Sequence, residues 1–275
     1  MLAFLSGQLS ALGLPPVLHS YLVAVAFVAI VYAAFFVVER LRPVEPIDWS
    51  SIWLNVRLAL VTQGTIVLAA AWLQPFLASG AGSVLGGTGY IKSGSFAWQS
   101  LLFVGYLLVY DFLYYWLHRA QHRFDALWAI HKLHHTDTQV NVTTTLRVHW
   151  LEEVLKAVLI IFPVSILFDA PPVAQVWLAT ILGLWIFFIH LNMRISFGPL
   201  SWLLTSPAAH RIHHSLDHRQ SNSNFAAIFP LWDIVFGTFR NPVAWQGTAG
   251  FYAGASNETL RMLIGRDISG GPPRG

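Results

Sequence analysis

Long apolar runs separated by polar segments dominate this chain. Residues 20–38 contain no charged side chain and are followed by Glu39–Arg42. Residues 52–77 and 97–117 are two further apolar runs, with Arg57 and Asp111 as their charged residues. A bilayer core of about 30 Å needs roughly 20 apolar residues in helical form. We therefore predict three membrane-spanning helices. The first 39 residues contain no Lys or Arg, so the first run is expected to be an uncleaved anchor helix and not a signal peptide.

Two shorter apolar runs follow, at residues 154–168 and 173–189, and a Pro-containing turn at 169–172 separates them. Each is short for a complete span, and Pro163 is expected to kink the first. They predict a helical hairpin that either crosses the membrane and returns or only dips into it. We expect residues 79–95 to form a loop, and the residues from His190 onward to be extramembrane or interfacial. The prediction is an all-α membrane bundle of four or five membrane helices.

The composition supports this class. Hydrophobic residues make up 55% of the chain and charged residues 11%, whereas soluble domains carry about 25% charged residues. This difference argues against an ordinary soluble enzyme and a disordered chain. The net charge of +3 is too small for a phosphate-binding face, so no nucleic-acid partner is expected. The chain has no cysteine, which excludes disulfides and thiolate metal sites.

The distribution of basic residues predicts the orientation. Of the 16 Lys and Arg residues, only Lys92 falls in a loop placed on the outer side. The positive-inside rule then places the N-terminus outside and the histidine-rich segments in the cytoplasm. The expected location is a bacterial inner membrane.

Nine of the 12 histidines are concentrated in three motifs and one single position. The motifs are HxxxH at 118–122, HxxHH at 131–135 and HxxHH at 210–214, and His190 closes the last apolar run. Side chains at i and i+4 share one helix face about 5–6 Å apart, which suits chelation. No single motif can complete a site, so the motifs must converge. The predicted ligands are His118, His122, His131, His134, His135, His190, His210, His213 and His214.

The number of ligands indicates the kind of metal site. Imidazole suits Zn, Cu, Fe and Ni, and a zinc hydrolase needs only three protein ligands and one open position. Eight or nine histidines therefore predict two metals. An alternative is a membrane metal transporter or metal sensor, but transporters place their ligands near the bilayer midplane. Here the motifs lie beyond the ends of the apolar runs, which favours an enzyme.

The order and spacing of these motifs resemble the fatty acid hydroxylase/sterol desaturase superfamily. The resemblance runs from Asp111 to Arg240, and residues 137–153, 188–192, 206–215, 222–225 and 231–238 resemble segments of that family. It implies a catalytic domain at 97–240, preceded by membrane helices and an outer loop at 1–96 and followed by a tail at 241–275.

The resemblance also implies a reaction. Two non-haem irons would use O₂ and two electrons to hydroxylate or desaturate an unactivated C–H position of a lipid substrate. A separate reductase, ferredoxin or cytochrome would supply the electrons.

Carboxylates are expected to hold the ligand rings, because a metal-bound histidine usually donates its other N–H to a carboxylate or carbonyl. Asp111 lies two helical turns before His118, inside an apolar run; its alternative is a local hydrogen bond to Tyr114, Tyr115 or Arg57. The remaining carboxylate candidates are Asp137, Glu152, Asp217 and Asp233.

Three more polar residues near the motifs have open roles. Asn192 follows His190 in the segment that resembles the family, and it is a further candidate for supporting the metal ligands. His149 has no second histidine at i+3 or i+4, so it could support the site or the substrate entrance, bind metal, or make an interfacial hydrogen bond. His218 could be a ligand, a polar group near the substrate, or a solvated loop residue.

Overall fold

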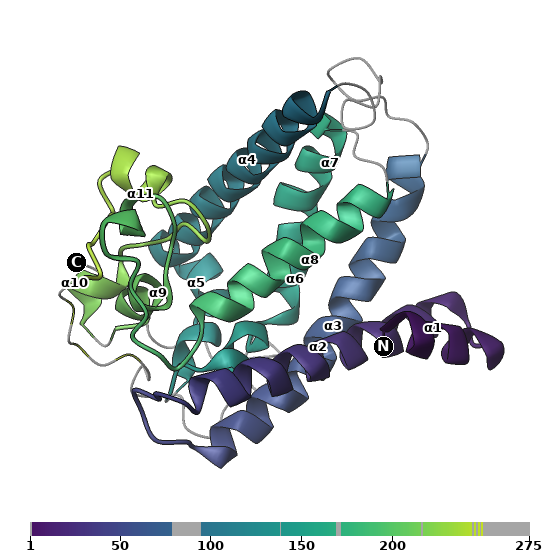
Figure 1. Cartoon of the computed structure of the whole chain (residues 1–275), viewed down its shortest axis with the longest axis horizontal. Coiled ribbons are helices and arrows are strands. Elements are labelled where there is room, and N and C mark those ends of the chain that lie inside the picture. Colours follow the sequence, from purple (N-terminus) through teal and green to yellow (C-terminus); the bar gives the residue numbers. More distant parts are fainter. Residues whose placement is uncertain are drawn as a thin grey trace.

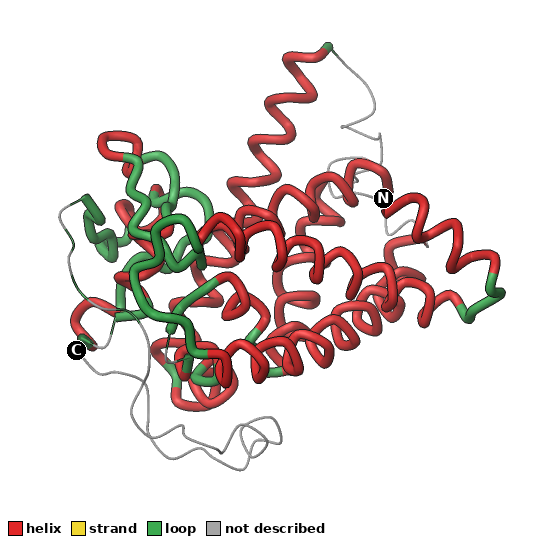
Figure 2. Tube along the Cα trace, turned by 60° about the horizontal axis from the view of Figure 1, so that its bottom comes forward, coloured by secondary structure: helices red, strands yellow, loops and turns green. Residues whose placement is uncertain are grey.

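The structure, a computed structural model, describes residues 2–78, 95–137, 139–168, 172–215 and 217–243 together with residues 245, 247 and 249. Within these residues the chain is helical and forms no strand (Figure 2), apart from one isolated bridge between Ser215 and Ala249. The predicted all-α fold is confirmed. The loop expected before Ser95, the turn at 169–171 and the tail from residue 250 onward lie outside the described residues.

Three long helices match the three predicted spans. They are α2 (Pro16–Glu39), α3 (Trp49–Ala78) and α4 (Phe96–Arg123), and each is long and apolar enough to cross a membrane. Helix α2 begins with Pro16, whose missing N–H costs nothing at a first helical position. Helix α4 begins where the Ser95 side chain accepts a hydrogen bond from the backbone N–H of Trp98. The sequence analysis missed a short additional helix, α1 (Leu2–Ala11).

The predicted hairpin is present, with an irregularity in its first arm. That arm consists of α6 (Trp150–Lys156), a π-helical turn (Ala157–Ile161) and α7 (Phe162–Phe168), and the second arm is α8 (Pro172–Ile189). Pro163 has no N–H, and its ring would clash with the carbonyl of Leu159 in a regular α-helix. A wider π turn directly before the proline avoids this clash. Both arms are shorter than the three long helices, so a fourth and fifth span stay a prediction.

Helix α8 packs between two apolar clusters, and Figure 1 shows it in the middle of the helical bundle. On one side its Leu182 joins a cluster with Leu117 of α4 and Val164 of α7. On the other side its Phe187 joins Val28 and Tyr32 of α2. This packing fixes the C-terminal end of α8, where His190 follows.

Short helices collect at the end of the molecule where α4 ends (Figure 1). The short helices are α5 (Asp125–His131), η1 (His134–Thr136), η2 (Val142–Leu146), η4 (Gly198–Trp202), α9 (Pro207–His213), α10 (His218–Ser221) and α11 (Leu231–Val235). Helix α4 ends at Arg123, and the extended backbone of Phe124 separates it from α5. They carry most of the histidine motifs.

The N-terminal helices are fastened to this histidine-rich end. Asn55 of α3 donates to the Asp137 carboxylate at 2.7 Å. The carboxylate of Glu39, the last residue of α2, accepts the backbone N–H groups of Val142 and Asn192 at 3.1 and 3.0 Å. These hydrogen bonds join residues on both sides of residue 96, and the bounds of the catalytic domain stay a prediction.

Candidate metal centre

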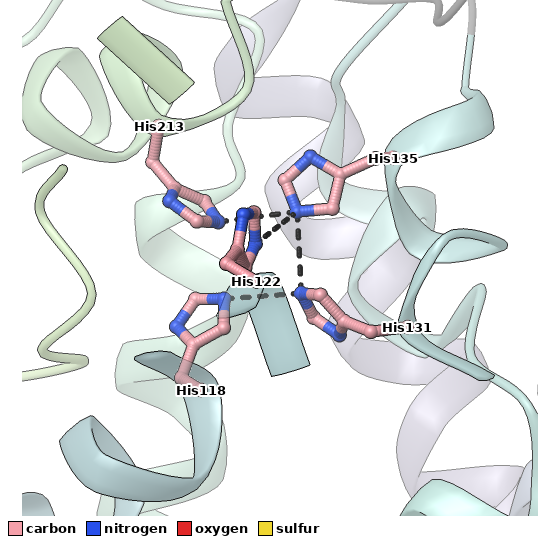
Figure 3. A group of neighbouring side chains, drawn as sticks. All are labelled: His118, His122, His131, His135 and His213. Atoms are coloured by element: carbon pink, nitrogen blue, oxygen red, sulfur yellow. Dashed lines mark hydrogen bonds between the residues drawn. The ribbon is translucent and has the colours of Figure 1, made fainter. Parts of the chain in front are cut away.

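The structure brings all nine predicted ligands together, in two adjacent groups. His118, His122, His131, His135 and His213 form the first group, shown in Figure 3. His134, His190, His210 and His214 form the second. Within each group, one nitrogen of every ring lies within 4.8 Å of the others. The rings of His135 and His214, one from each group, stack with centroids 4.5 Å apart, so the groups are neighbours.

The three motifs divide their histidines between the groups by a common rule. In each motif the residues at i and i+4 enter the same group, as His118 and His122 do at the end of α4. The i+3 residue of each HxxHH motif belongs to the other group. His134 lies in the second group although the rest of its motif lies in the first, and His213 lies in the first although the rest of its motif lies in the second. Residues at i, i+3 and i+4 of a helix are all neighbours, so the spacing alone does not set this division; it depends on how α5, η1 and α9 pack against one another.

The Nε2 atoms face inward in both groups. The Nε2 atoms of His118 and His131 are 3.1 Å apart, as are those of His122 and His135. In the second group the Nε2 atom of His190 lies 3.1 Å from that of His134 and 2.9 Å from that of His210.

The outer nitrogens of four rings face acceptors. Nδ1 of His118 donates to the carbonyl of Phe225 at 2.8 Å, and Nδ1 of His213 donates to that of Ser223 at 2.9 Å. Nδ1 of His190 donates to the Ile186 carbonyl at 2.7 Å. Nδ1 of His131 faces the carboxylate of Glu152 at 3.1 Å. A neutral ring with its proton on Nδ1 presents the lone pair of Nε2 to the centre.

This arrangement suits a cation. His118 and His131 both have Nδ1 committed as a donor, so as neutral rings they have no proton for the 3.1 Å contact between their Nε2 atoms. Two lone pairs at this distance repel each other, and a metal ion removes the repulsion by accepting both. The residues present therefore fit a metal held by imidazole nitrogens.

Burial keeps the imidazoles in the form that binds metal. All nine side chains are at most 7% exposed. Burial lowers the pKa of His213 to about 3, and the neighbouring His131 contributes in the same direction. Burial followed by mutual repulsion also lowers the pKa values of His134, His135, His210 and His214 well below that of a free imidazole. Neutral rings at pH 7 need lose no proton on binding a metal.

Glu152 is the carboxylate candidate that contacts a ligand ring directly. It lies on α6, and its second oxygen pairs with the ammonium of Lys156 at 3.0 Å. Burial alone would raise the pKa of Glu152, but the charge of Lys156 and the hydrogen bond with His131 outweigh this effect and lower the pKa to about 2. The carboxylate is thus ionised and orients His131 through a charge-assisted hydrogen bond.

Asp111 and Asp233 act on the site through the backbone. Asp111 accepts the N–H groups of Ala227, Ile228 and Phe229 at 2.9, 3.0 and 2.7 Å. Asp233 accepts the N–H groups of residues 225 and 226 at 2.8 and 2.9 Å. Together they fix the segment 225–229, whose first carbonyl receives Nδ1 of His118. The local alternative for Asp111, a bond to a tyrosine or to Arg57, is not the arrangement found.

The other carboxylate and amide candidates brace neighbouring loops. Asp137 accepts from Ser51, Asn55 and Thr144. The side chain of Asn192 accepts the backbone N–H groups of Val44 and Glu45 at 3.2 and 3.1 Å.

His149 and Asp217 lie outside both groups. His149 is buried at the N-terminus of α6, where its Nδ1 accepts the backbone N–H of Leu151 at 3.2 Å. It thus caps the helix that carries Glu152. Asp217 is exposed, and its carbonyl accepts from the N–H groups of Gln220 and Ser221 at the start of α10. The side chain of His218 is outside the described residues.

Several supporting residues escaped the sequence analysis. The carbonyls of Ile186, Ser223 and Phe225 have no side-chain signature and follow only from the fold. Lys156 was a detectable candidate, since it stands four residues after Glu152 on one helix. Arg211 is fully buried and pairs with Glu45 from the α2–α3 connection, and its guanidinium also donates to the carbonyl of Val140 at 3.0 Å.

Comparison with known proteins identifies relatives of this site. Residues 103–238 match the family described as fatty acid hydroxylase. The alkylglycerol monooxygenases of Xenopus tropicalis and Homo sapiens are each 36% identical, over 129 and 130 residues, which is 47% of this chain and 28% of either relative. An ornithine lipid hydroxylase of Rhizobium tropici is 32% identical over 136 residues, or 50% of this chain and 41% of that protein. The chain thus spans well under half the length of these relatives. No solved structure matches the chain.

Proposed function

Because residues 103–238 of this chain belong to the fatty acid hydroxylase family, we propose that it is a membrane-bound di-iron oxygenase that hydroxylates an unactivated C–H position of a lipid. The observation that carries the proposal is the pair of buried groups in which nine imidazoles turn nitrogens toward two adjacent centres. Three helices long and apolar enough to span a membrane support a site close to the bilayer.

Each group would hold one iron. The first group would hold it through five imidazole nitrogens and the second through four. Bound iron would supply the oxidising power that an unactivated C–H bond requires, since no acid or base of a protein removes such a hydrogen. The family supports iron over the other metals that imidazole accepts.

The protein residues would orient the ligand rings and exclude water from the two centres. Glu152 holds the ring of His131, and Asp111 with Asp233 holds the backbone that orients His118. Burial of the histidines excludes water from the centres, which protects the reaction from side reactions. The overall reaction consumes the lipid, O₂, two electrons and two protons, and yields the hydroxylated lipid and water. The chain has no cysteine for an iron–sulfur cluster, so the electrons would come from a separate reductase, ferredoxin or cytochrome.

The names of the relatives favour particular products. One relative is named a monooxygenase of alkylglycerols and another a hydroxylase of ornithine lipids, so we propose hydroxylation in preference to desaturation. The substrate class would be a membrane lipid with a polar headgroup. The distribution of basic residues supports a site on the cytoplasmic side, with the N-terminus outside.

A metal transporter or sensor is the competing function. The two groups lie at and beyond the end of α4, where the short helices collect, and not at the middle of the long helices. Transport would place them near the bilayer midplane.

Lipid analysis tests the proposal. Membranes of bacterial cells that express the wild type, His134→Ala or His149→Asn would be extracted after growth under isotopically heavy O₂. We expect one lipid class to gain one heavy oxygen atom in cells with the wild type and His149→Asn, and not with His134→Ala. Unchanged lipids in all three strains, with metal uptake that depends on His134, would instead establish the transporter.

A further inference from the structure

Large apolar side chains are exposed on the part of the molecule that carries the short helices. On η4 and at the residue directly after it they are Leu200, Trp202 and Leu203, with exposed fractions of 57, 50 and 63%. On α11 they are Leu231, Ile234 and Val235, with exposed fractions of 42, 37 and 59%. Water-facing surfaces seldom expose so many large apolar side chains together, and such patches mark an interaction site.

The two helices form one surface. The ring of Trp202 packs on that of Phe239, with centroids 4.7 Å apart. Phe239 is tied to α11, because its N–H donates to the carbonyl of Asp233 at 3.1 Å. We call these six exposed residues, five on the two helices and Leu203 directly after η4, the η4–α11 surface.

This surface continues the outward-facing side of a membrane helix. Trp232 of α11 packs against Phe112 of α4, and Phe236 packs against Trp116 of α4, both with ring centroids 4.8 Å apart. Trp116 itself is 42% exposed. Figure 1 shows α11 beside α4, toward its C-terminal end.

Exposed tryptophans indicate where the bilayer ends. Trp98 and Trp116 are exposed and stand 18 positions apart on α4, which is about 27 Å at 1.5 Å per residue. Trp53 and Trp72 on α3 are also exposed and have nearly the same separation. These lengths approach the bilayer core of about 30 Å, and tryptophan is enriched at both membrane boundaries. Trp116 therefore lies at the boundary, level with α11.

Basic side chains accompany the apolar ones. The guanidinium of Arg119 lies 5.6 Å from the ring centroid of Trp116 and donates to the hydroxyl of Tyr115 at 2.7 Å. Arg240 is exposed just after Phe239. Arginine at this depth attracts anionic headgroups.

We propose that the η4–α11 surface is inserted into the headgroup region of the leaflet on the metal side, and that lipid covers it. Amphipathic segments with tryptophan and aliphatic residues on one face and arginine nearby lie in this plane. The extramembrane end of the molecule is then partly sunk into the leaflet and does not stand free in water.

Single cysteines can test this, because the natural chain has none. The variants L203C and V235C would be labelled with an environment-sensitive fluorophore in nanodiscs of phosphatidylcholine and phosphatidylglycerol. Quenching would be measured with iodide in the water and with spin-labelled lipids that carry the quencher near the headgroup. V104C, exposed in the middle of α4, is the lipid-facing control, and D125C, exposed on α5, is the control outside the apolar surface.

We expect the labels at 203 and 235 to be quenched several-fold more weakly by iodide than the label at 125, and strongly by the headgroup-level quencher. The label at 104 should be quenched most strongly by lipids that carry the spin label deeper in their acyl chains. Iodide quenching at 203 and 235 equal to that at 125 would overturn the proposal. Self-quenching between labelled copies, which disappears on dilution with unlabelled protein, would overturn it in favour of an interface between two copies of the chain.

Discussion

The carboxylate of Glu152 lies between the Nδ1 atom of His131, at 3.1 Å, and the ammonium of Lys156, at 3.0 Å. It is the one direct contact between a carboxylate and a proposed ligand ring among the described residues. Replacing such a partner typically costs 10–100-fold in metal affinity. We expect Glu152→Gln, which keeps the shape and removes the charge, to weaken iron binding by about this factor, as measured by competition with a chelator.

The neighbouring Glu153 provides the control for that prediction. It also pairs with Lys156, at 2.9 Å, but the contact with His131 belongs to Glu152. Glu153→Gln should retain wild-type iron affinity. Equal losses in both variants would mean that the charge of Lys156, and not the orientation of His131, is what matters.

The two groups predict separate losses of metal. His122 belongs to the first group and His190 to the second. With iron in excess, His122→Ala and His190→Ala should each retain one iron equivalent, and the double variant should retain none. Elemental analysis of the purified proteins measures this directly. If either single variant retained both irons, that residue would not be a ligand.

Replacing Asp111 with asparagine is expected to lower both the stability of the protein and its affinity for iron. An asparagine there cannot accept all three backbone N–H groups that the carboxylate accepts. The unsatisfied donors should cost about 1–3 kcal/mol of unfolding free energy, measured by denaturation in detergent. Iron affinity should fall as well, since residues 225–229 orient His118. Asp125→Asn, at an exposed position on α5, should change neither quantity.

Replacing His149 with alanine is expected to lower the stability of the protein without loss of iron. Its ring caps α6 by accepting the N–H of Leu151, and removal of a capping side chain costs about 0.5–2 kcal/mol. His149→Ala should show this cost in thermal unfolding, while His149→Asn should recover most of it because asparagine also caps helices. A loss of iron in both variants would instead make His149 a ligand.

Sequence patterns predicted the long helices and the residues that meet at the centre, for different reasons. The spans at 20–38, 52–77 and 97–117 are set by local hydropathy, so they correspond to α2, α3 and α4 within a few residues. The histidine motifs stand out because i, i+3 and i+4 spacings have a direct geometric meaning. Sequence could not reveal that the i+3 histidine crosses to the other group, because that depends on how α5, η1 and α9 face one another.

The supporting contacts were harder to predict, again for a physical reason. Asp111 stood out as a charge within an apolar run, but its partners are backbone N–H groups 116 to 118 residues further along the chain. Backbone groups are the same at every residue, so no motif marks them. The contact of Glu45 with Arg211 spans 166 residues and lies partly outside the matched region, and it too depends on the final packing.

The exchange of His134 and His213 between the groups has a consequence for how the protein acquires its metals. The segment 131–135 and the segment 210–214 each contribute to both centres, so the first ion to bind fixes the rotation of both segments. The second ion then meets rings that are already ordered and pays less conformational entropy. Loading should therefore be cooperative: at limiting iron, a population of this protein would divide into molecules with two ions and molecules with none, and the singly loaded form would be scarce.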